Sequence, residues 1–185
     1  MNILKSLLEF KKLIVLFILG YVAYLATEVI FTALTGQALH IFHNNYFSFQ
    51  GFTSLYMGIV GGIILIILSI INEIKFFRKL PMFFHAFIGC GIITLLELGS
   101  GLFLNVLCGF KLWDYSELWF NYKGQICLLY SFFWFCFSPM VFWVSDTLKW
   151  VFYKIDPSEG SRTEYNLLDY YRALFNFKTC LDTIK

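Results

Sequence analysis

Charged residues are scarce in this sequence: lysine, arginine, aspartate and glutamate make up only 14% of its 185 residues. A soluble globular domain carries about 25% of them, so the chain lacks the polar surface that contact with water requires. Apolar residues account for 59% of the sequence and aromatic residues for 21%. These proportions exclude an ordinary soluble domain and indicate a protein whose surface faces lipid.

Several functional signatures are also missing. The basic residues form no long run and the net charge is only +2, so we expect no nucleic-acid partner. The cysteines form no C-x-x-C pair, and the sequence has no H-E-x-x-H motif, phosphate loop or G-x-S-x-G elbow. We therefore predict no metal site, no cofactor and no catalytic residue. Cys108 and Cys127 flank one loop and could pair in an oxidising compartment.

Four apolar stretches are long enough to cross a bilayer, at residues 13–35, 53–72, 82–107 and 125–151. A spanning helix needs about 20 such residues, and in lipid only helices or closed barrels satisfy the backbone. The sequence therefore predicts an all-α polytopic domain over residues 1–155. A cytoplasmic tail over 156–185 follows a turn-rich break and carries an amphipathic helix at 164–182, which either lies on the membrane surface or docks onto a partner.

The orientation of the spans follows from the basic residues. Lysine and arginine concentrate at the N-terminus, in the 73–81 link and after the fourth span, whereas the 36–52 loop has neither. The 108–124 loop offsets its two lysines with an aspartate and a glutamate. The positive-inside rule predicts an integral membrane protein with both termini in the cytoplasm and these two loops outside.

Two glutamates interrupt the apolar spans. A carboxylate in mid-membrane costs about 2.5–3.5 kcal/mol even on the lenient insertion scale and indicates function by default. Glu28 and Glu97 each lie about 15 residues beyond the start of their span, roughly 22 Å from the cytoplasmic edge. We expect them to share a polar space in the outer half of the membrane. The alternative is that each carboxyl is only hydrogen-bonded to a neighbouring helix.

Other polar residues near the outer ends of the spans predict the rest of this site. The neutral candidates are Thr32, Thr53, Ser54 and Asn105. The 108–124 loop adds Trp113, Asp114 and Tyr115, which we expect to form the roof of the cavity without performing chemistry. An aspartate at a turn satisfies backbone amides, and tryptophan and tyrosine anchor at the membrane interface.

The second half of the sequence echoes the first. The segments Gln50–Tyr56 and Lys123–Leu129 each open a span and each follow a glutamate-bearing span and an outer loop. This pattern predicts two parallel helical hairpins related by an axis along the membrane normal. Glu28 and Glu97 would then be equivalent positions.

Four short motifs occur in order along the chain: Glu28–Ala33, Gly51–Met57, Glu97–Gly101 and Trp113–Ser116, the last followed by Gly124. This series resembles the ABC-transporter type IV (CmpB-like) family, and especially its transmembrane protein 229 relatives, over residues 20–145. The sequence departs from the family where Gly58, Val60 and Gly61 replace an often-found proline or tyrosine. The resemblance implies a small polytopic membrane protein whose family label is transport.

Three functions remain open at this point. The first is a transport or membrane-binding subunit whose outer-half site holds a cation, a proton or a lipid headgroup. The second is a structural or assembly subunit in which the carboxyls only hold helices together. The third is a membrane-embedded enzyme acting on a lipid, which would need a nucleophile, metal or cofactor that the sequence does not indicate. The expected partners are membrane lipids and other membrane subunits or copies of the chain.

The orientation can be tested by labelling. We expect single cysteines introduced at His43 and Glu117, in a cysteine-free background, to react with an impermeant maleimide from the non-cytoplasmic side. Both positions lie in loops that the charge distribution places outside. Labelling of either position only after the cytoplasmic face is permeabilised would contradict the four-span arrangement.

Overall fold

A computed structural model describes residues 3–34, 50–153 and 166–177 of the protein. Its long helices are α1 (Ile3–Leu34), α3 (Leu55–Asn72), α5 (Met82–Gly101), which continues as the π-helix η2 (Leu102–Leu107), and α6 (Leu128–Tyr153). The shorter elements are α4 (Lys75–Arg78), α7 (Leu167–Asn176), β1 (Asn121–Tyr122) and β2 (Ile126–Cys127).

Four helices within the described residues are long and apolar enough to cross a membrane. They comprise Leu7–Leu34, Leu55–Asn72, Met82–Leu107 and Leu128–Phe152. The predicted all-α polytopic fold is therefore confirmed. Most of the predicted outer loop at 36–52 lies outside the described residues, and the side of the membrane on which each end lies stays a prediction.

Three predicted span starts differ from the structure. The first span begins at Leu7 rather than at 13, because the helix already runs through the apolar residues before Lys11. The fourth helix begins at Leu128 rather than at 125, because Ile126–Cys127 pair antiparallel with Asn121–Tyr122 in a short hairpin. The second begins at Leu55 rather than at 53, because Ser54 is its N-cap and accepts a bond from the Tyr56 amide at 3.4 Å. An N-cap hydroxyl satisfies one of the backbone amides that the first helical turn leaves unpaired.

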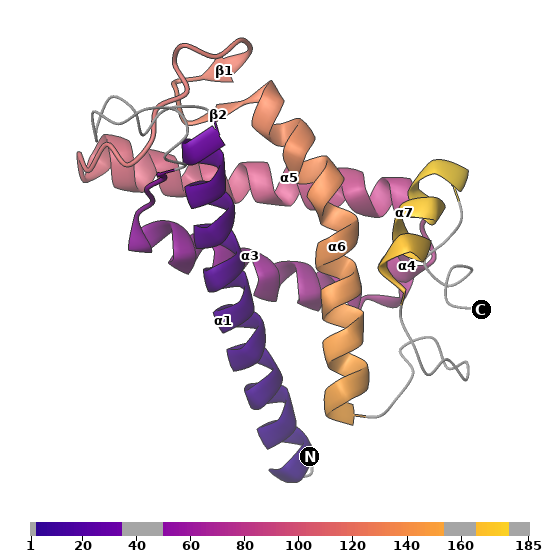
Figure 1. Cartoon of the computed structure of the whole chain (residues 1–185). Helices are drawn as coiled ribbons and strands as arrows, with labels where there is room; N and C mark the ends of the chain where they lie inside the picture. The colour runs from indigo at the N-terminus through magenta and orange to yellow at the C-terminus, as the bar shows by residue number, and fades with distance from the viewer. Residues whose placement is uncertain (1–2, 35–49, 154–165, 178–185) are drawn as a thin grey trace.

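The helices pack as two consecutive pairs. α1 packs mainly against α3 and α5 mainly against α6, and in Figure 1 α1 and α6 cross α3 and α5 steeply. This pairing is compatible with the two hairpins expected from the internal repeat, which stays a prediction. The β1–β2 hairpin lies at one end of the bundle, and α4 and α7 lie at the opposite end.

Charged side chains join the helices at the end opposite the hairpin. The buried ammonium of Lys12 on α1 lies 2.6 Å from the Glu73 carboxylate, which Lys149 on α6 also approaches at 3.6 Å. Glu73 caps the C-terminus of α3. The start of α1, the end of α3 and the end of α6 therefore meet at one point.

The C-terminal helix docks onto its own bundle through a buried aspartate. Asp146 on α6 accepts hydrogen bonds from Asn72 at 2.9 Å, from Arg78 at 3.1 Å and from the Tyr170 hydroxyl at 2.7 Å. Removing one partner of a buried charge pair leaves the other charge uncompensated, so this cluster fixes α3, α4 and α7 to α6. The sequence left two locations possible for this helix, the membrane surface and the surface of a separate partner. The structure instead buries its Tyr170 face against the bundle.

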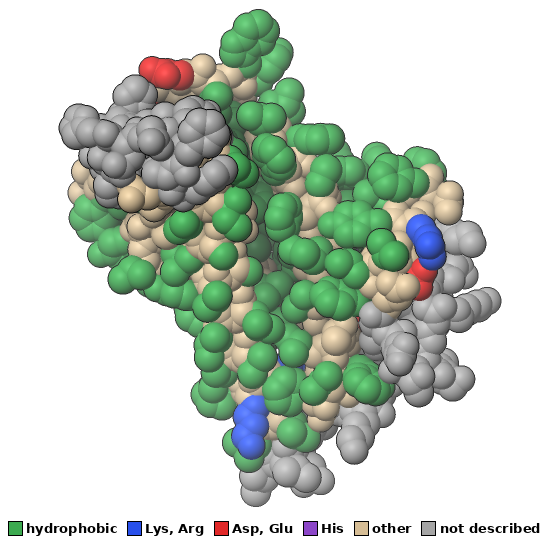
Figure 2. Space-filling view, viewed as in Figure 1, with side chains coloured by type: hydrophobic (Ala, Val, Ile, Leu, Met, Phe, Trp, Pro, Cys, Tyr) green, Lys and Arg blue, Asp and Glu red, His purple; other side chains and the backbone are tan. Residues whose placement is uncertain are grey.

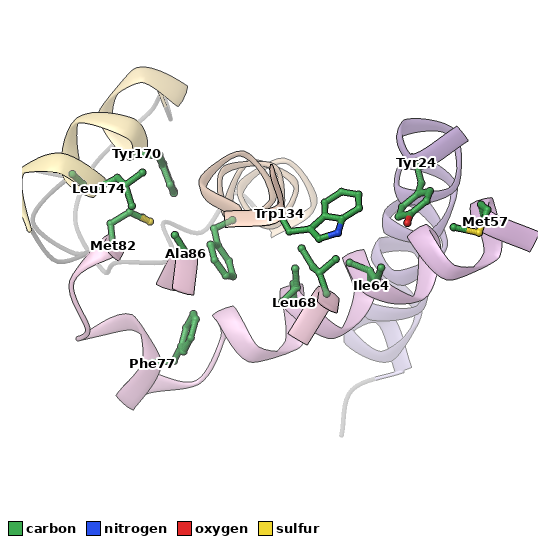
Figure 3. Close-up of a cluster of buried hydrophobic side chains, with 13 residues drawn as sticks. Tyr24, Met57, Ile64, Leu68, Phe77, Met82, Ala86, Trp134, Tyr170 and Leu174 are labelled. Atoms are coloured by element: carbon green, nitrogen blue, oxygen red, sulfur yellow. The ribbon is translucent and has the colours of Figure 1, made fainter. Parts of the chain in front are cut away.

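The exterior and interior separate as expected for a protein in lipid. Apolar side chains cover the face seen in Figure 2. Large exposed examples are Ile18, Val22, Ile30, Phe87 and Leu95. The buried core runs along the bundle from Met57 to Leu174, with the Tyr24 ring close to its Met57 end and the Trp134 ring nearer its middle (Figure 3). These two rings stack with centroids 5.5 Å apart.

Glycines let α1 and α3 approach closely. A Cβ added at Gly20 would lie 2.5 Å from the carbonyl oxygen of Gly61, and one added at Gly61 would collide with the Cβ of Tyr24. Apolar surface is not driven together in lipid, so close backbone packing of this kind supplies much of the attraction between spans.

We expect Gly61→Ala to lower the free energy of unfolding by about 1–3 kcal/mol, the usual cost of overpacking a filled interior. The measurement is the apparent melting temperature of the purified protein in detergent micelles. Gly91→Ala is the matched control, because a Cβ there meets nothing within 4 Å. Equal melting temperatures for the two variants would show that the α1–α3 glycine contact does not limit stability.

Candidate functional site

A cavity of about 290 Å³ lies at the hairpin end of the bundle, between α1, the start of α3, the 112–115 loop and α6. Its lining comprises Glu28, Phe31, Thr32, Phe52, Thr53, Ser54, Met57, Leu112, Trp113, Asp114, Tyr115 and Tyr130. The cavity thus brings together all the predicted site residues except Glu97 and Asn105. We refer to it as the outer cavity, after the orientation expected from the charge distribution.

Thr32 fixes the wall of the outer cavity between α1 and α3. Its hydroxyl accepts a hydrogen bond from the Phe52 amide at 2.9 Å and lies 3.0 Å from the Phe52 carbonyl oxygen. Gly51 allows this contact, because a Cβ there would collide with the carbonyl of Val29 on α1. The segment that carries Thr53 and Ser54 is therefore held directly against α1.

The hydroxyl of Thr53 is buried and has no hydrogen-bond partner among the described residues. Leaving a buried hydroxyl unpaired costs about 1–3 kcal/mol, and such groups in native structures call for an explanation. Because Thr53 lines the outer cavity, a bound polar ligand or water would supply the partner.

Glu28 brings a carboxyl group to the outer cavity. Its side chain is half-buried on α1, inside the candidate span Leu7–Leu34. Within the described part of the chain, this carboxyl makes no ion pair and no hydrogen bond. No lysine or arginine belongs to the lining as far as the described residues form it. The outer cavity therefore carries negative charge without a neutralising partner from those residues.

The 113–115 segment forms one wall of the outer cavity. Asp114 accepts a hydrogen bond from the Ser116 amide at 2.8 Å, which is the turn contact expected of it. The Trp113 indole donates to the Gln125 carbonyl at 3.0 Å. Gly124 adopts φ +69°, and a Cβ there would collide with the Asp114 carboxylate, so glycine suits both the backbone and the packing.

Asn105 does not line the outer cavity but holds this wall in place. Its amide nitrogen donates to the Trp113 carbonyl at 3.1 Å and to the Gln125 side chain at 2.8 Å. Its amide oxygen accepts from the Leu112 backbone at 2.7 Å. These bonds occupy the side chain with the loop, so Asn105 acts on the cavity only through the loop.

Glu97 has a different environment from Glu28. Its side chain is 1% exposed, and it accepts hydrogen bonds from the Tyr24 hydroxyl at 3.1 Å and the Trp134 indole at 2.9 Å. Glu97 on α5 thereby joins α1 and α6. The structure places one glutamate on the lining of the outer cavity and the other in a closed set of helix contacts.

Sequence reasoning included Trp113 and Tyr115 but missed Phe31, Phe52 and Tyr130 among the aromatic residues of the outer cavity. Phe31 packs edge-on to Tyr130 with centroids 4.8 Å apart, and Tyr130 stacks on Tyr115 at 4.3 Å. Because 21% of the whole chain is aromatic, aromatic residues at these positions did not stand out from their neighbours in the sequence.

Tyr115 remains a hydrogen-bond donor at this site. Burial raises the pKa of its phenol well above the ordinary value, and the nearby carboxyl groups of Glu97 and Glu28 raise it further. The hydroxyl therefore keeps its proton throughout the physiological pH range.

The described residues contain no group of three or more histidine, cysteine, aspartate or glutamate side chains arranged to hold a metal ion. Cys108 is an exposed free thiol and Cys127 a buried one, so the disulfide left open by the sequence is not formed. The arrangement favours binding of a polar or cationic group over covalent chemistry.

Comparison with protein-family models matches residues 14–162 to the family described as Putative ABC-transporter type IV. The matched range contains both helix pairs and every lining residue of the outer cavity. Comparison with curated proteins and with solved structures yields no match. The family description suggests a transport-related membrane protein. Because the match covers well over half of the chain, this protein belongs to the Putative ABC-transporter type IV family.

Proposed function

We propose that this membrane protein is a transport or membrane-binding subunit that binds a cation in the outer cavity, with Glu28 as the counter-charge. The observation that carries the proposal is the Glu28 carboxyl itself, which lines the cavity and has no partner among the described residues. A carboxyl group at membrane depth is costly and marks an ion or substrate path by default. A bound cation would offset that cost.

The other lining groups support a cation of the ammonium type. The rings of Phe31, Trp113 and Tyr130 belong to the lining, and aromatic faces attract cations by about 0.5–2 kcal/mol each. The unpaired Thr53 hydroxyl and the Tyr115 phenol add neutral polar contacts. The carboxyls of Glu28 and Asp114 and the hydroxyls of the lining would also suit a hard metal ion, which takes oxygen ligands alone. An organic ammonium would use the aromatic rings as well, and this favours it over a metal ion.

The structural alternative is supported by Glu97. Its carboxylate is fully engaged by Tyr24 and Trp134, as expected of a side chain that holds helices together. Glu28 has no comparable contacts, so we assign the two glutamates separate roles. Glu97 holds the helices together, and Glu28 binds the ligand. Among the described residues, the lining contains no cysteine, histidine or lysine.

We expect Glu28→Gln to weaken binding of tetramethylammonium at least tenfold, because the amide keeps the size of the side chain but removes its charge. Tenfold corresponds to about 1.4 kcal/mol. The measurement is equilibrium dialysis of radiolabelled tetramethylammonium against the purified protein in neutral detergent.

Glu117→Gln is the matched control, because Glu117 is exposed and does not line the outer cavity. This variant should bind as the unaltered protein does. If the unaltered protein binds no tetramethylammonium, or if Glu28→Gln binds it equally well, the proposed cation site is wrong. In that case the assembly role becomes the better account of Glu28 as well.

A further inference from the structure

The outer cavity continues into an apolar groove between α1 and α6. A hollow of about 430 Å³ shares Glu28, Phe31 and Tyr130 with the outer cavity. It shares Thr27, Trp134 and Phe137 with a second hollow of about 200 Å³ deeper in the bundle. We call these two hollows the α1–α6 groove. In Figure 2 the surface between α1 and α6 is hollowed and bordered by apolar side chains.

The polarity of this path changes sharply at Glu28. Beyond it, the walls are hydrocarbon and aromatic, including Leu19, Met140 and Val144. The hydroxyl of Thr27 donates to the Ala23 carbonyl of its own helix at 2.8 Å, so it offers the groove no free donor. From Glu28 to Leu19 the groove follows α1 for about 13 Å, at 1.5 Å per residue. A cavity that carries carboxyl groups and a long apolar groove thus adjoin each other, with Glu28 on the walls of both.

We propose that the ligand of this site is a membrane amphiphile with an ammonium headgroup, bound with its head in the outer cavity and its hydrocarbon chain in the α1–α6 groove. The proposal rests on the proposed cation site and names the class of ligand that fills it. The sign of the headgroup follows from charge complementarity, because the lining includes Glu28 and Asp114 but no lysine or arginine.

The pairing of the helices explains why the groove exists. α1 packs mainly on α3 and α6 mainly on α5, so α1 and α6 touch each other less than either touches its own partner. α1 and α6 meet through the Tyr24–Glu97–Trp134 bonds and through Phe31 and Tyr130, whose ring centroids lie 4.8 Å apart. The aromatic side chains of this set form part of the walls of the groove. A chain in the groove would exchange lipid contacts for protein contacts, so chain burial gives little affinity on its own. The headgroup must therefore select the ligand.

The position of the chain is the property to test. The probe is an alkyltrimethylammonium with an aliphatic diazirine near the chain end, added to the protein in phosphatidylglycerol vesicles, which supply no competing ammonium. After irradiation, we expect labelling to concentrate on groove residues such as Leu19, Met140 and Val144, as mapped by peptide mass spectrometry. Groove labelling should be at least fivefold weaker with a probe whose headgroup is a hydroxyl. It should be at least fivefold weaker also when the ammonium probe is used with the Glu28→Gln variant.

A pair of variants separates the groove from the headgroup site. Ala23→Phe places a ring in the groove, since Ala23 is exposed and lines its deeper part. Ala26→Phe makes the same change at an exposed position outside both hollows. We expect Ala23→Phe to reduce groove labelling at least fivefold and Ala26→Phe to leave it unchanged. Both should still bind tetramethylammonium, which also shows that they are folded.

The outcomes distinguish the two proposals. If tetramethylammonium binding depends on Glu28 but labelling spreads evenly over lipid-facing positions such as Phe87 and Leu95, the amphiphile is wrong and the cation site stands. Groove labelling that Ala23→Phe does not reduce would likewise contradict the amphiphile proposal and leave the cation site intact. If neither tetramethylammonium binding nor groove labelling depends on Glu28, both proposals fall.

Discussion

The carboxylate of Glu97 joins three spans of this protein, and the rest of the bundle depends on that contact. It accepts one hydrogen bond from Tyr24 on α1 and one from Trp134 on α6 while lying almost completely buried on α5. In lipid, apolar faces gain little by leaving hydrocarbon for protein, so polar contacts and close packing must join the helices. The glycine contact holds α1 against α3, and direct packing of the two helices holds α5 against α6. The Glu97 contacts join one pair to the other.

Charged side chains have different roles at the two ends of the bundle. At the end opposite the β1–β2 hairpin, Asp146 and Glu73 have basic partners and join the helices. At the hairpin end, the loop is held by neutral bonds from Asn105 and the Trp113 indole. Glu28 receives no basic partner there from the described residues. A rigid frame around an unpaired carboxyl is the arrangement expected of a preorganised binding site, because little has to move when the ligand arrives.

The proposed headgroup site and groove together give a physical reason for the two-pair architecture. A tight four-helix bundle would close the space between α1 and α6. Here each of these helices has its main partner elsewhere, so a hollow remains on the lipid-facing side and opens at Glu28. For a membrane protein of this family, such a path would let an amphiphile enter from the bilayer without leaving hydrocarbon. Its charged head would then meet Glu28, whose carboxyl belongs to the lining of both the groove and the outer cavity.

The sequence by itself determined the four spans, the helical class and most of the lining of the outer cavity. Long apolar runs permit only helices in lipid, and polar residues near the ends of those runs have few places to lie. Glu28, Thr32, Thr53 and the Trp113–Tyr115 segment could therefore be assigned to one region from chain position alone. The short hairpin at Asn121–Cys127 could not be predicted in this way. Its second strand, Ile126–Cys127, is apolar and directly precedes the fourth span, so in the sequence it looks like part of that span.

Only the tertiary structure decided how the two glutamates differ. The sequence predicted them at matching depths on spans that run in the same direction, so position along the chain made them equivalent. Their roles depend instead on which side chains of other helices face them, and those are set by rotation and crossing of the helices. Tyr24 and Trp134 close around Glu97, whereas Glu28 faces a cavity and has no side-chain partner among the described residues. Helix rotation is fixed by packing between spans, which a single sequence records only as faint stripes of small and polar residues.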